Sequence, residues 1–265
     1  MLTESDRGEL ADRLRVAERD RRPVKPLIYQ FPGLDAADAY EIQLWNIKRR
    51  LAGGVRVAGH KVGLSSEAMQ RMMGVDEPDY GHLLSDMWLS EDEPVPVTRY
   101  CYPRVEVEVG FLLGADLPGE GCTEADVLAA TEAFLPAIEL IDSRILDWRI
   151  SLPDTIADNA SSAGFVLGAQ RIAPSEVDVT AIDAVLYKGS EEVVAGRSDA
   201  VLGNPATAVA WLAGKVERFG VRLSAGQIVL PGSCTRAIDA HQGDHFRADF
   251  RAHDAEVGSV SVSFE

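Results

Sequence analysis

The chain has 265 residues, of which 46% are hydrophobic and 26% charged, and its formal net charge at pH 7 is −16. These values are typical of a globular protein with a sizeable core, built as one large domain or two small ones. The acidic balance excludes a nucleic-acid surface, which needs a basic stripe, and fits a protein that repels anionic polymers and attracts cations.

The cysteines and the N-terminal residues bear on the cellular compartment. Cys101, Cys122 and Cys234 form no C-x-x-C pair, and an odd number fits no closed disulfide set. Charges appear from the fourth residue onward, and no apolar segment of a signal peptide follows. No run approaches the roughly 18 uninterrupted apolar residues of a membrane span. We therefore expect a cytoplasmic protein with reduced cysteines and no membrane partner.

The first 60 residues are predicted to form a helical portion. Leu10 and Leu14 share one face of a charged helix between Thr3 and Arg22, which prolines follow. A second helix is predicted from Asp35 to the glycine pair at 53–54. Its apolar stripe follows i, i+4, i+7, i+11 and consists of Tyr40, Leu44, Ile47 and Leu51. Such a stripe indicates either core packing or a subunit contact.

The chain becomes strand-rich after Gly54. Residues 55–64 read as a strand, 65–74 as a short helix and 75–84 as a loop. Further β-like runs are predicted at 104–113, 137–142, 163–168, 183–187, 226–231, 245–250 and 257–264. Two more helices are predicted, one over 123–134 and one from the Asn204-Pro205 cap to Gly220.

This order of elements predicts the fold class. Many short strands with few helices indicate a barrel or a folded-over sheet, and their irregular alternation argues against a doubly wound sheet. We expect a β-rich α+β chain in which residues 1–60 form the helical portion and residues 61–265 the β-rich domain, together as one compact unit.

The candidate site begins with two glutamates on one predicted strand. In PRVEVEVGF (103–111), Glu106 and Glu108 lie on the same strand face, roughly 6.5 Å apart along it. That face is either solvated or holds a ligand. A third acid, Glu139, interrupts the apolar run within FLPAIELIDSR (134–144), so its carboxylate is expected to be at least partly buried.

A buried carboxylate needs a basic partner, a raised pKa or a metal ion. Arg144 and Arg104 are the partners at hand, so an arginine–glutamate network is one interpretation. The other is a divalent cation, because three carboxylates need more positive charge than two arginines bring. Mg²⁺ suits Glu106, Glu108 and Glu139, since it takes oxygen ligands and keeps positions for water or substrate.

Further polar residues surround this acidic set in the sequence. Lys61, in AGHKVGL, is either a solvent-directed lysine or a partly desolvated site cation. The segment GVDEPDYG supplies loop acids that are either solvated or functional: Asp76, Glu77 and Asp79. Residues ahead of the strand at 163–168 either form turns or line a pocket mouth: Asp158, Asn159, Ser161 and Ser162.

Several common chemistries lack their signatures. The five histidines show no H-E-x-x-H or similar spacing, which disfavours zinc. G-x-S-x-G is absent, so a serine hydrolase has little support. The glycine motifs of nucleotide-binding loops are also absent.

Five segments resemble the 2-hydroxypenta-2,4-dienoate (2-keto-4-pentenoate) hydratases of the fumarylacetoacetate-hydrolase superfamily. They keep the family's order from about residue 35 to the C-terminus and are GHKVGLSSEAMQRMMGVDEPDYGHLLSDM, PRVEVEVGFLLGADL, PAIELIDSRILDWRISLPDTIADNAS, LGNPATAVAWLA and GSVSVSF. The resemblance implies a mixed β-roll or barrel-like fold with an N-terminal helical portion, in which the β-rich domain is catalytic.

The resemblance also implies site residues. It implies Mg²⁺ or Mn²⁺ held by three glutamates, which match Glu106, Glu108 and Glu139. The family's lysine, aspartate and serine match Lys61, Asp79 and Ser161. Met73 occupies a position where the family usually has a substrate-contacting leucine.

The implied reaction is the metal-dependent addition of water to a 2-hydroxy-2,4-dienoate, giving a 4-hydroxy-2-oxoacid in aromatic or steroid catabolism. Lys61 would stabilise the substrate carboxylate or enolate and take part in proton delivery, Asp79 would transfer protons, and Ser161 would orient substrate or water. The resemblance and the apolar stripe further predict a homo-oligomer, and a downstream aldolase or decarboxylase is a candidate partner.

Alternatives within the superfamily stay open at this stage. Its C–C hydrolases use a histidine–glutamate pair on a lid, and residues 65–80 contain no histidine, which favours a hydratase. The competing family member is 4-oxalocrotonate decarboxylase, although GVDEPDYG and the DW of ILDWRI look more like the hydratase. A non-catalytic partner subunit is the third alternative.

Overall fold

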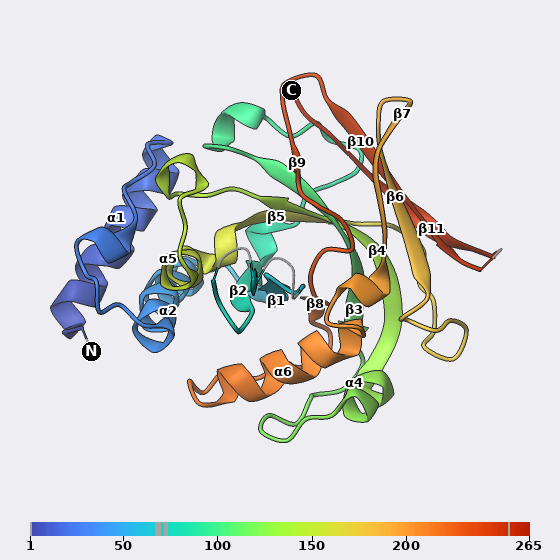
Figure 1. Cartoon of the computed structure of the whole chain (residues 1–265), viewed down its shortest axis with the longest axis horizontal. Helices are drawn as coiled ribbons and strands as arrows, with labels where there is room; N and C mark the ends of the chain where they lie inside the picture. Colours follow the sequence, from blue (N-terminus) through green and yellow to red (C-terminus); the bar gives the residue numbers. More distant parts are fainter. Residues whose placement is uncertain (1, 67–69, 72–73, 254) are drawn as a thin grey trace.

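The computed structural model describes residues 2–66, 70–71, 74–253 and 255–265, and its helical and strand elements are shown in Figure 1. The helices, with 3-10 turns marked η, are α1 Glu4–Asp20, η1 Leu27–Tyr29, α2 Ala36–Ala52, η2 Ser85–Met87, η3 Val97–Arg99, α4 Glu124–Ala130, η4 Leu146–Trp148, α5 Leu152–Ala157, η5 Asn159–Ser161, η6 Ser198–Ala200 and α6 Pro205–Glu217. The strands are β1 Val57–Gly63, β2 Asp79–Leu84, β3 Arg104–Leu113, β4 Thr131–Ile141, β5 Ser162–Leu167, β6 Ile182–Lys188, β7 Glu191–Arg197, β8 Ile228–Leu230, β9 Ile238–Asp239, β10 His245–Ala252 and β11 Ala255–Ser263.

The N-terminal helices form where the sequence predicts them, and a side chain caps the start of each. Thr3 caps α1 in a capping box with Asp6, and Asp35 caps α2 by accepting from the Asp38 amide. Leu10 and Leu14 of α1 are buried in the main core. The prediction of two helices in this part of the chain is therefore confirmed.

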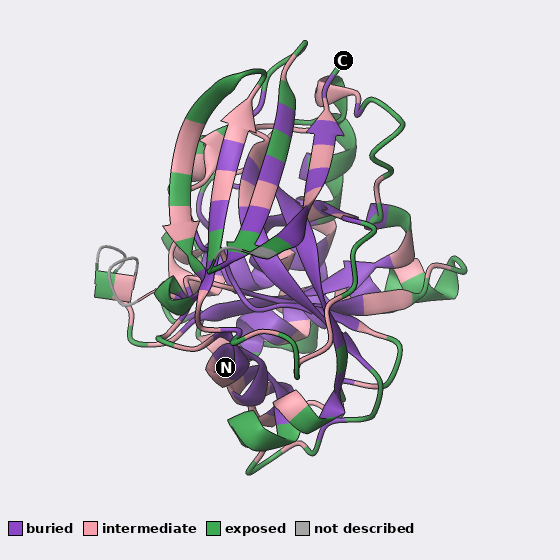
Figure 2. Cartoon of the chain, turned by 90° about the vertical axis from the view of Figure 1, so that its right-hand side faces the viewer, coloured by how far each residue is buried: buried purple, intermediate pink, exposed green. Residues whose placement is uncertain are grey.

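The strands form two sheets. The larger sheet has the order β2-β1-β8-β3-β4-β5, with β9 paired to β3, and is mixed because β1 and β8 run parallel. The smaller sheet, β11-β10-β6-β7, is antiparallel throughout. It packs beside β4 at the right of Figure 1, and strands of both sheets carry residues coloured as buried in Figure 2. The folded-over, β-rich architecture is confirmed.

Two predicted elements are wrong. Residues 79–84, within the predicted loop, form β2, which is buried along its whole length and pairs antiparallel with β1. The helix predicted over 123–134 ends at Ala130, and β4 starts at Thr131 because pairing with β3 outweighs the helical preference of the TEAF segment. The predicted helix at 65–74 lies partly outside the described residues.

Apart from the 3-10 turns, the sequence analysis missed two strands and one α-helix. The two-residue strand β9 is too short to give a period-two signal. The edge strand β7 is largely exposed and begins with two glutamates, which resemble a polar loop. The helix α5 has only six residues, although Ser151 and Asp154 form a capping box that marks its start.

The apolar stripe of α2 is mainly core. Tyr40, Leu44 and Ile47 are buried within this chain, whereas Leu51 is 38% exposed. The stripe therefore gives no argument for the predicted homo-oligomer.

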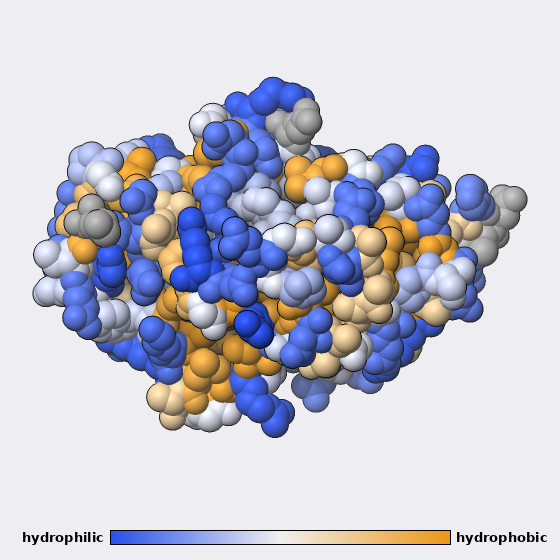
Figure 3. All heavy atoms as spheres, turned by 90° about the horizontal axis from the view of Figure 1, so that it is seen from below, coloured by the Kyte–Doolittle hydropathy of each residue, from blue (hydrophilic) through white to orange (hydrophobic). Residues whose placement is uncertain are grey.

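Apolar side chains also gather in the middle of the face seen from below in Figure 3, between hydrophilic ends. Within the described part of the chain, none of the helices combines the length and the apolarity that a membrane crossing requires.

Candidate active site

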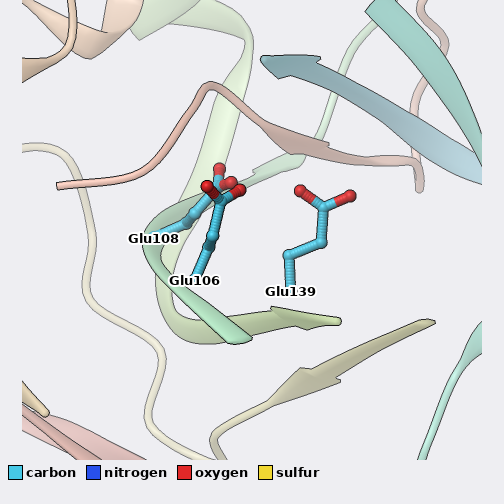
Figure 4. Close-up of side chains that lie close together, drawn as sticks. All are labelled: Glu106, Glu108 and Glu139. Carbon is cyan, nitrogen blue, oxygen red and sulfur yellow. The ribbon is translucent and has the colours of Figure 1, made fainter. Parts of the chain in front are cut away.

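The pairing of β3 with β4 brings the three predicted glutamates together. Glu106 lies directly opposite Glu139 in the antiparallel register, and Glu108 follows on the same face of β3. Figure 4 shows the three carboxylates converging. One oxygen from each lies within 4.8 Å of the others. Glu108 and Glu139 are fully buried and Glu106 partly so, which makes the solvated-face interpretation wrong.

The arginine–glutamate network is also wrong, because both arginines bind aspartates. Arg104 Nε lies 2.7 Å from an oxygen of Asp239, and Arg144 Nε lies 2.6 Å from an oxygen of Asp158. The positive charge that approaches the glutamates is Lys61, whose Nζ lies 3.4 Å from Glu139 Oε2.

The protein supplies few hydrogen bonds to these carboxylates. Glu108 Oε2 accepts one from the Gly232 amide at 2.7 Å. Glu108 Oε1 and both oxygens of Glu139 are buried and accept no hydrogen bond of good geometry from any described residue. Burial, and then the charges of the neighbouring glutamates, raise the pKa of Glu108 well above its usual value.

The other two glutamates are shifted in the same direction. Burial raises the pKa of Glu106 to about 7 against the opposing charge of Lys61, and the same two influences act on Glu139 with a net increase in its pKa. Clustered, buried carboxylate oxygens without partners are the donor set that a hard divalent cation takes. The residues present therefore fit a metal ion such as Mg²⁺.

Lys61 is a buried site cation and does not extend into solvent. It lies on β1, is 2% exposed, and donates from Nζ to the Ala160 carbonyl at 3.0 Å. Burial alone would lower the pKa of Lys61, but the surrounding carboxylates, Glu139 and Asp79 foremost, outweigh it and raise the pKa. The ammonium is thus held charged inside the protein.

Asp79 begins β2 next to Lys61. Its Oδ2 accepts from Thr155 Oγ1 at 2.7 Å, whereas its buried Oδ1 has no hydrogen-bond partner among the described residues. Gly63 leaves room for this pair, because a Cβ at Gly63 would lie 2.2 Å from Asp79 Oδ1 and 3.0 Å from Lys61 Nζ. Of the other acids in the same segment, Glu77 pairs with Lys215 and Asp76 is exposed.

Ser161 is presented by a strained turn. Asn159, Ala160 and Ser161 all have left-handed φ angles, of 56°, 50° and 55°, which cost roughly 1–2 kcal/mol per residue. Asn159 holds the turn by accepting from the His82 amide and donating to the His82 carbonyl, at 2.8 and 2.9 Å. Ser161 Oγ is left buried without a described partner. The turn also supplies the Ala160 carbonyl to Lys61.

A cavity of about 220 Å³ unites the predicted residues. Its lining includes Lys61, Asp79, Glu106 and Ser161. The remaining lining residues were not picked out from the sequence as site residues: Gly63, Leu64, Arg104, Ile141, Trp148, Ile150, Thr155, Ala160 and Ala237. A usable signal was the S-x-x-D capping box of α5, which fixes the helix carrying Thr155.

Three of the four polar residues picked out ahead of the strand at 163–168 do not join the cavity lining: Asp158, Asn159, which holds the turn, and Ser162. Asp158 is turned toward Arg144 and serves the turn rather than the pocket. Ser162 starts β5 and is buried, and its hydroxyl acts on the Glu139 carboxylate, where it opposes the increase in pKa that burial causes. Met73, the predicted substrate contact, lies outside the described residues.

Comparison with solved structures defines the class. A fumarylacetoacetate hydrolase family protein from yeast matches with a TM-score of 0.60 and 11% identity, covering 78% of this chain and 91% of that one. The 4-oxalocrotonate decarboxylase from Pseudomonas putida G7, complexed with magnesium and adipate, matches with a TM-score of 0.95 and 32% identity, covering 100% and 99%. The chain therefore has the fold of the fumarylacetoacetate-hydrolase superfamily.

Sequence comparison then defines the family. A 2-keto-4-pentenoate hydratase from Paraburkholderia xenovorans is 41% identical over 264 residues, covering 100% of this chain and 97% of that protein. A 2-oxo-hept-4-ene-1,7-dioate hydratase from Escherichia coli is 40% identical over 261 residues, covering 96% of each. No family model matches the chain. The chain belongs to the 2-keto-4-pentenoate hydratase family, as the sequence predicted.

Proposed function

We infer that this chain is a hydro-lyase that adds water to a 2-hydroxy-2,4-dienoate and releases a 4-hydroxy-2-oxoacid, with a divalent metal ion as cofactor. The observation that carries the inference is the cluster of buried glutamates beside Lys61 and Asp79, in a chain that is 41% identical over its length to a 2-keto-4-pentenoate hydratase. In the reaction, C5 gains a proton while the 2-hydroxyl loses one and becomes the 2-oxo group, and one water then supplies the hydroxyl at C4 and the proton at C3.

The three glutamates would hold the metal, and Mg²⁺ is the ion that we propose. Bound there, it would supply Lewis-acid and template chemistry for a substrate that offers a carboxylate and a neighbouring oxygen. Glu106 lines the cavity, whereas Glu108 and Glu139 are fully buried and are not part of its lining. Substrate would therefore approach from the side of Glu106.

Lys61 and Asp79 would have different roles in the reaction, charge stabilisation and proton transfer. The Lys61 ammonium, fixed by the Ala160 carbonyl, would stabilise negative charge on a substrate oxygen. Asp79 has one oxygen fixed by Thr155 and one without a described partner, so the second oxygen can exchange a proton with substrate or water. The hydroxyl of Ser161, which also lines the cavity, would orient substrate or water.

The test is the loss of ultraviolet absorbance of 2-hydroxypenta-2,4-dienoate with purified protein. We expect rapid decay with Mg²⁺, loss of activity after treatment with a chelator, and recovery when Mg²⁺ is added back. Decay that is insensitive to the chelator, or absence of decay with Mg²⁺ present, would contradict the proposal.

A decarboxylase activity is the second candidate. The overall likeness to 4-oxalocrotonate decarboxylase, at a TM-score of 0.95, favours testing it directly. Release of CO₂ from a 2-oxo-3-enedioate, with no hydration of the dienoate, would replace the hydratase by the decarboxylase. If the protein had neither activity, the remaining interpretation would be a non-catalytic partner subunit.

A further inference from the structure

The outer part of the active-site cavity holds residues that the proposed reaction does not use. Arg104 precedes Glu106 by two residues on β3, so its side chain leaves the same strand face roughly 6.5 Å away. Exposure increases along this face, from buried Glu108 through partly buried Glu106 to Arg104, whose side chain is 35% exposed. Arg104 therefore stands between the metal-binding glutamates and the solvent.

Arg104 offers hydrogen-bond donors that the protein does not use. Its Nε donates to Asp239 at 2.7 Å, and its guanidinium lies over the ring of Trp148, 4.6 Å from the centroid. Neither terminal nitrogen of Arg104 donates to any residue in the described part of the chain. The adjacent Trp148 also has a buried Nε1 with no acceptor among the described residues.

The two residues form a fixed unit at the cavity wall. Both line the active-site cavity, and both also line an outer cavity of about 320 Å³. Trp148 and the preceding Asp147 have left-handed φ angles of 55° and 56°, a conformation that persists only where the surroundings hold it. The lining of the active-site cavity is partly apolar, since it includes Ile141 and Ile150.

We propose that Arg104, aided by Trp148, binds a second carboxylate at the far end of the substrate. The substrate class is then a 2-hydroxy-2,4-dienoate with an acid group attached beyond C5. A guanidinium with free terminal nitrogens pairs with a carboxylate through two parallel hydrogen bonds, and the apolar lining accommodates the carbon chain between the two ends. This inference rests on the proposed function, because it assumes that the first carboxylate lies at the glutamates.

The kinetic test compares two substrates with the Mg²⁺-loaded protein. One is 2-hydroxypenta-2,4-dienoate, and the other is the same dienoate extended at C5 by a CH₂–COO⁻ group. Arg104→Met should lower the ratio of kcat/KM, dicarboxylate over monocarboxylate, by roughly 10- to 100-fold, as expected when a charged hydrogen bond is lost. Arg104→Lys should restore part of the ratio. Arg99→Met, at an exposed position outside the cavity, is the control for removal of one positive charge.

A second variant should change the ratio of kcat/KM, dicarboxylate over monocarboxylate, in the opposite direction. Asp239 offsets part of the positive charge of Arg104, so Asp239→Asn should raise the same ratio by about 2- to 5-fold, the range of an exposed ion pair. Binding of the unreactive ligands adipate and hexanoate, measured by calorimetry, gives a readout that needs no turnover. Arg104→Met should weaken adipate binding relative to hexanoate binding.

The outcomes separate this inference from the proposed function. If Arg104→Met lowers kcat/KM equally for both substrates, Arg104 binds their common end and the inference is overturned, while the hydratase stands. If the wild type turns over neither dienoate but binds adipate in an Arg104-dependent manner, the hydratase fails and the dicarboxylate pocket stands. If the wild type bound adipate and hexanoate equally well, the proposed binding of a second carboxylate would be contradicted.

Discussion

Two groups of buried acids lie close together in this chain, and they differ in what the protein provides for them. The first is the set of three glutamates, with one backbone amide and one lysine nearby. The second surrounds Arg144. Its guanidinium donates to the Asp158 carboxylate and to the Asp142 and Asp158 carbonyls, and Asp142 accepts from the amides of Cys101 and Tyr102.

The difference distinguishes a binding site from a structural ion pair. Both groups are buried, and burial raises the pKa of acids in both, so neither property separates them. What separates them is hydrogen bonding, since the Arg144 group is matched by donors of the chain, whereas three of the four carboxylate oxygens of Glu108 and Glu139 are not. Buried acids that the fold leaves unsatisfied point to a ligand that is not part of the chain.

The largest expected effect is at the glutamates. Glu108→Gln should abolish Mg²⁺-dependent hydration, lowering kcat/KM by more than about 1,000-fold, because a neutral amide is a poor ligand for the ion. It should not destabilise the metal-free protein, since it removes one of several crowded negative charges. Dienoate decay and urea unfolding measure the two effects, with Glu192→Gln on exposed β7 as control. Normal activity would remove Glu108 from the site.

Lys61→Ala should lower kcat by about 100- to 1,000-fold, as for the loss of one preorganised charge at the reaction centre. Mg²⁺ affinity should be kept or increased, because a neighbouring positive charge is removed. Calorimetric Mg²⁺ titration and dienoate turnover separate these quantities. A variant that fails to fold at all, or that loses metal and activity together, would indicate a structural lysine.

Arg144→Met tests the other side of the comparison. It should lower the free energy of unfolding by about 3–5 kcal/mol, because it leaves a buried aspartate unpaired. Urea unfolding is the measurement. Adding Asp158→Leu should recover part of the loss, since the unpaired charge is then removed. If Arg144→Met were neutral while Glu108→Gln were destabilising, the assignment of structural and functional acids would be reversed.

A third buried polar group, His60 and His82, sharpens the comparison because it is neutral. The two histidines are opposite each other on β1 and β2, with ring centroids 4.9 Å apart. Burial lowers the pKa of His60 from 6.5 to about 4. The neutral form is thus favoured in the folded state, so this stabilisation is complete above pH 6.5 and is lost as the pH falls toward 4.

The stability of the His60→Leu variant, compared with that of the wild type, should therefore increase as the pH falls. Between pH 7.5 and pH 5, the wild type should lose about 2 kcal/mol of unfolding free energy relative to this variant. Urea unfolding of both proteins at the two pH values gives the difference, in which the shared carboxylates cancel. A difference that does not change with pH would mean that His60 stays accessible to protons in the folded protein.

The sequence predicted the site residues more completely than the details of the secondary structure. Glu139 was found because one charge stood in an apolar run, and Glu106 and Glu108 because they share a strand face. Their convergence needed the register of β3 against β4, which no local pattern contains. For the same reason, the sequence did not show the true partner of Arg104, which was interpreted as a candidate partner for a glutamate. Its ion pair with Asp239 joins residues 135 positions apart.

The secondary-structure errors have a related cause. Local preference favoured a helix through Thr131 and a loop at 79–84, but both segments are strands because they pair with neighbours distant in sequence or across a loop. The predictions of the two N-terminal helices are confirmed because apolar spacing and the prolines and glycines that follow a helix are local signals.

The central claim is that the three glutamates hold a divalent cation. The most direct measurement is an anomalous difference map from crystals grown or soaked with Mn²⁺, which substitutes for Mg²⁺ at oxygen-rich sites. We predict a single strong peak bridged by the carboxylates of Glu106, Glu108 and Glu139. Absence of a peak there, in crystals of protein that is fully active with Mn²⁺, would contradict the account.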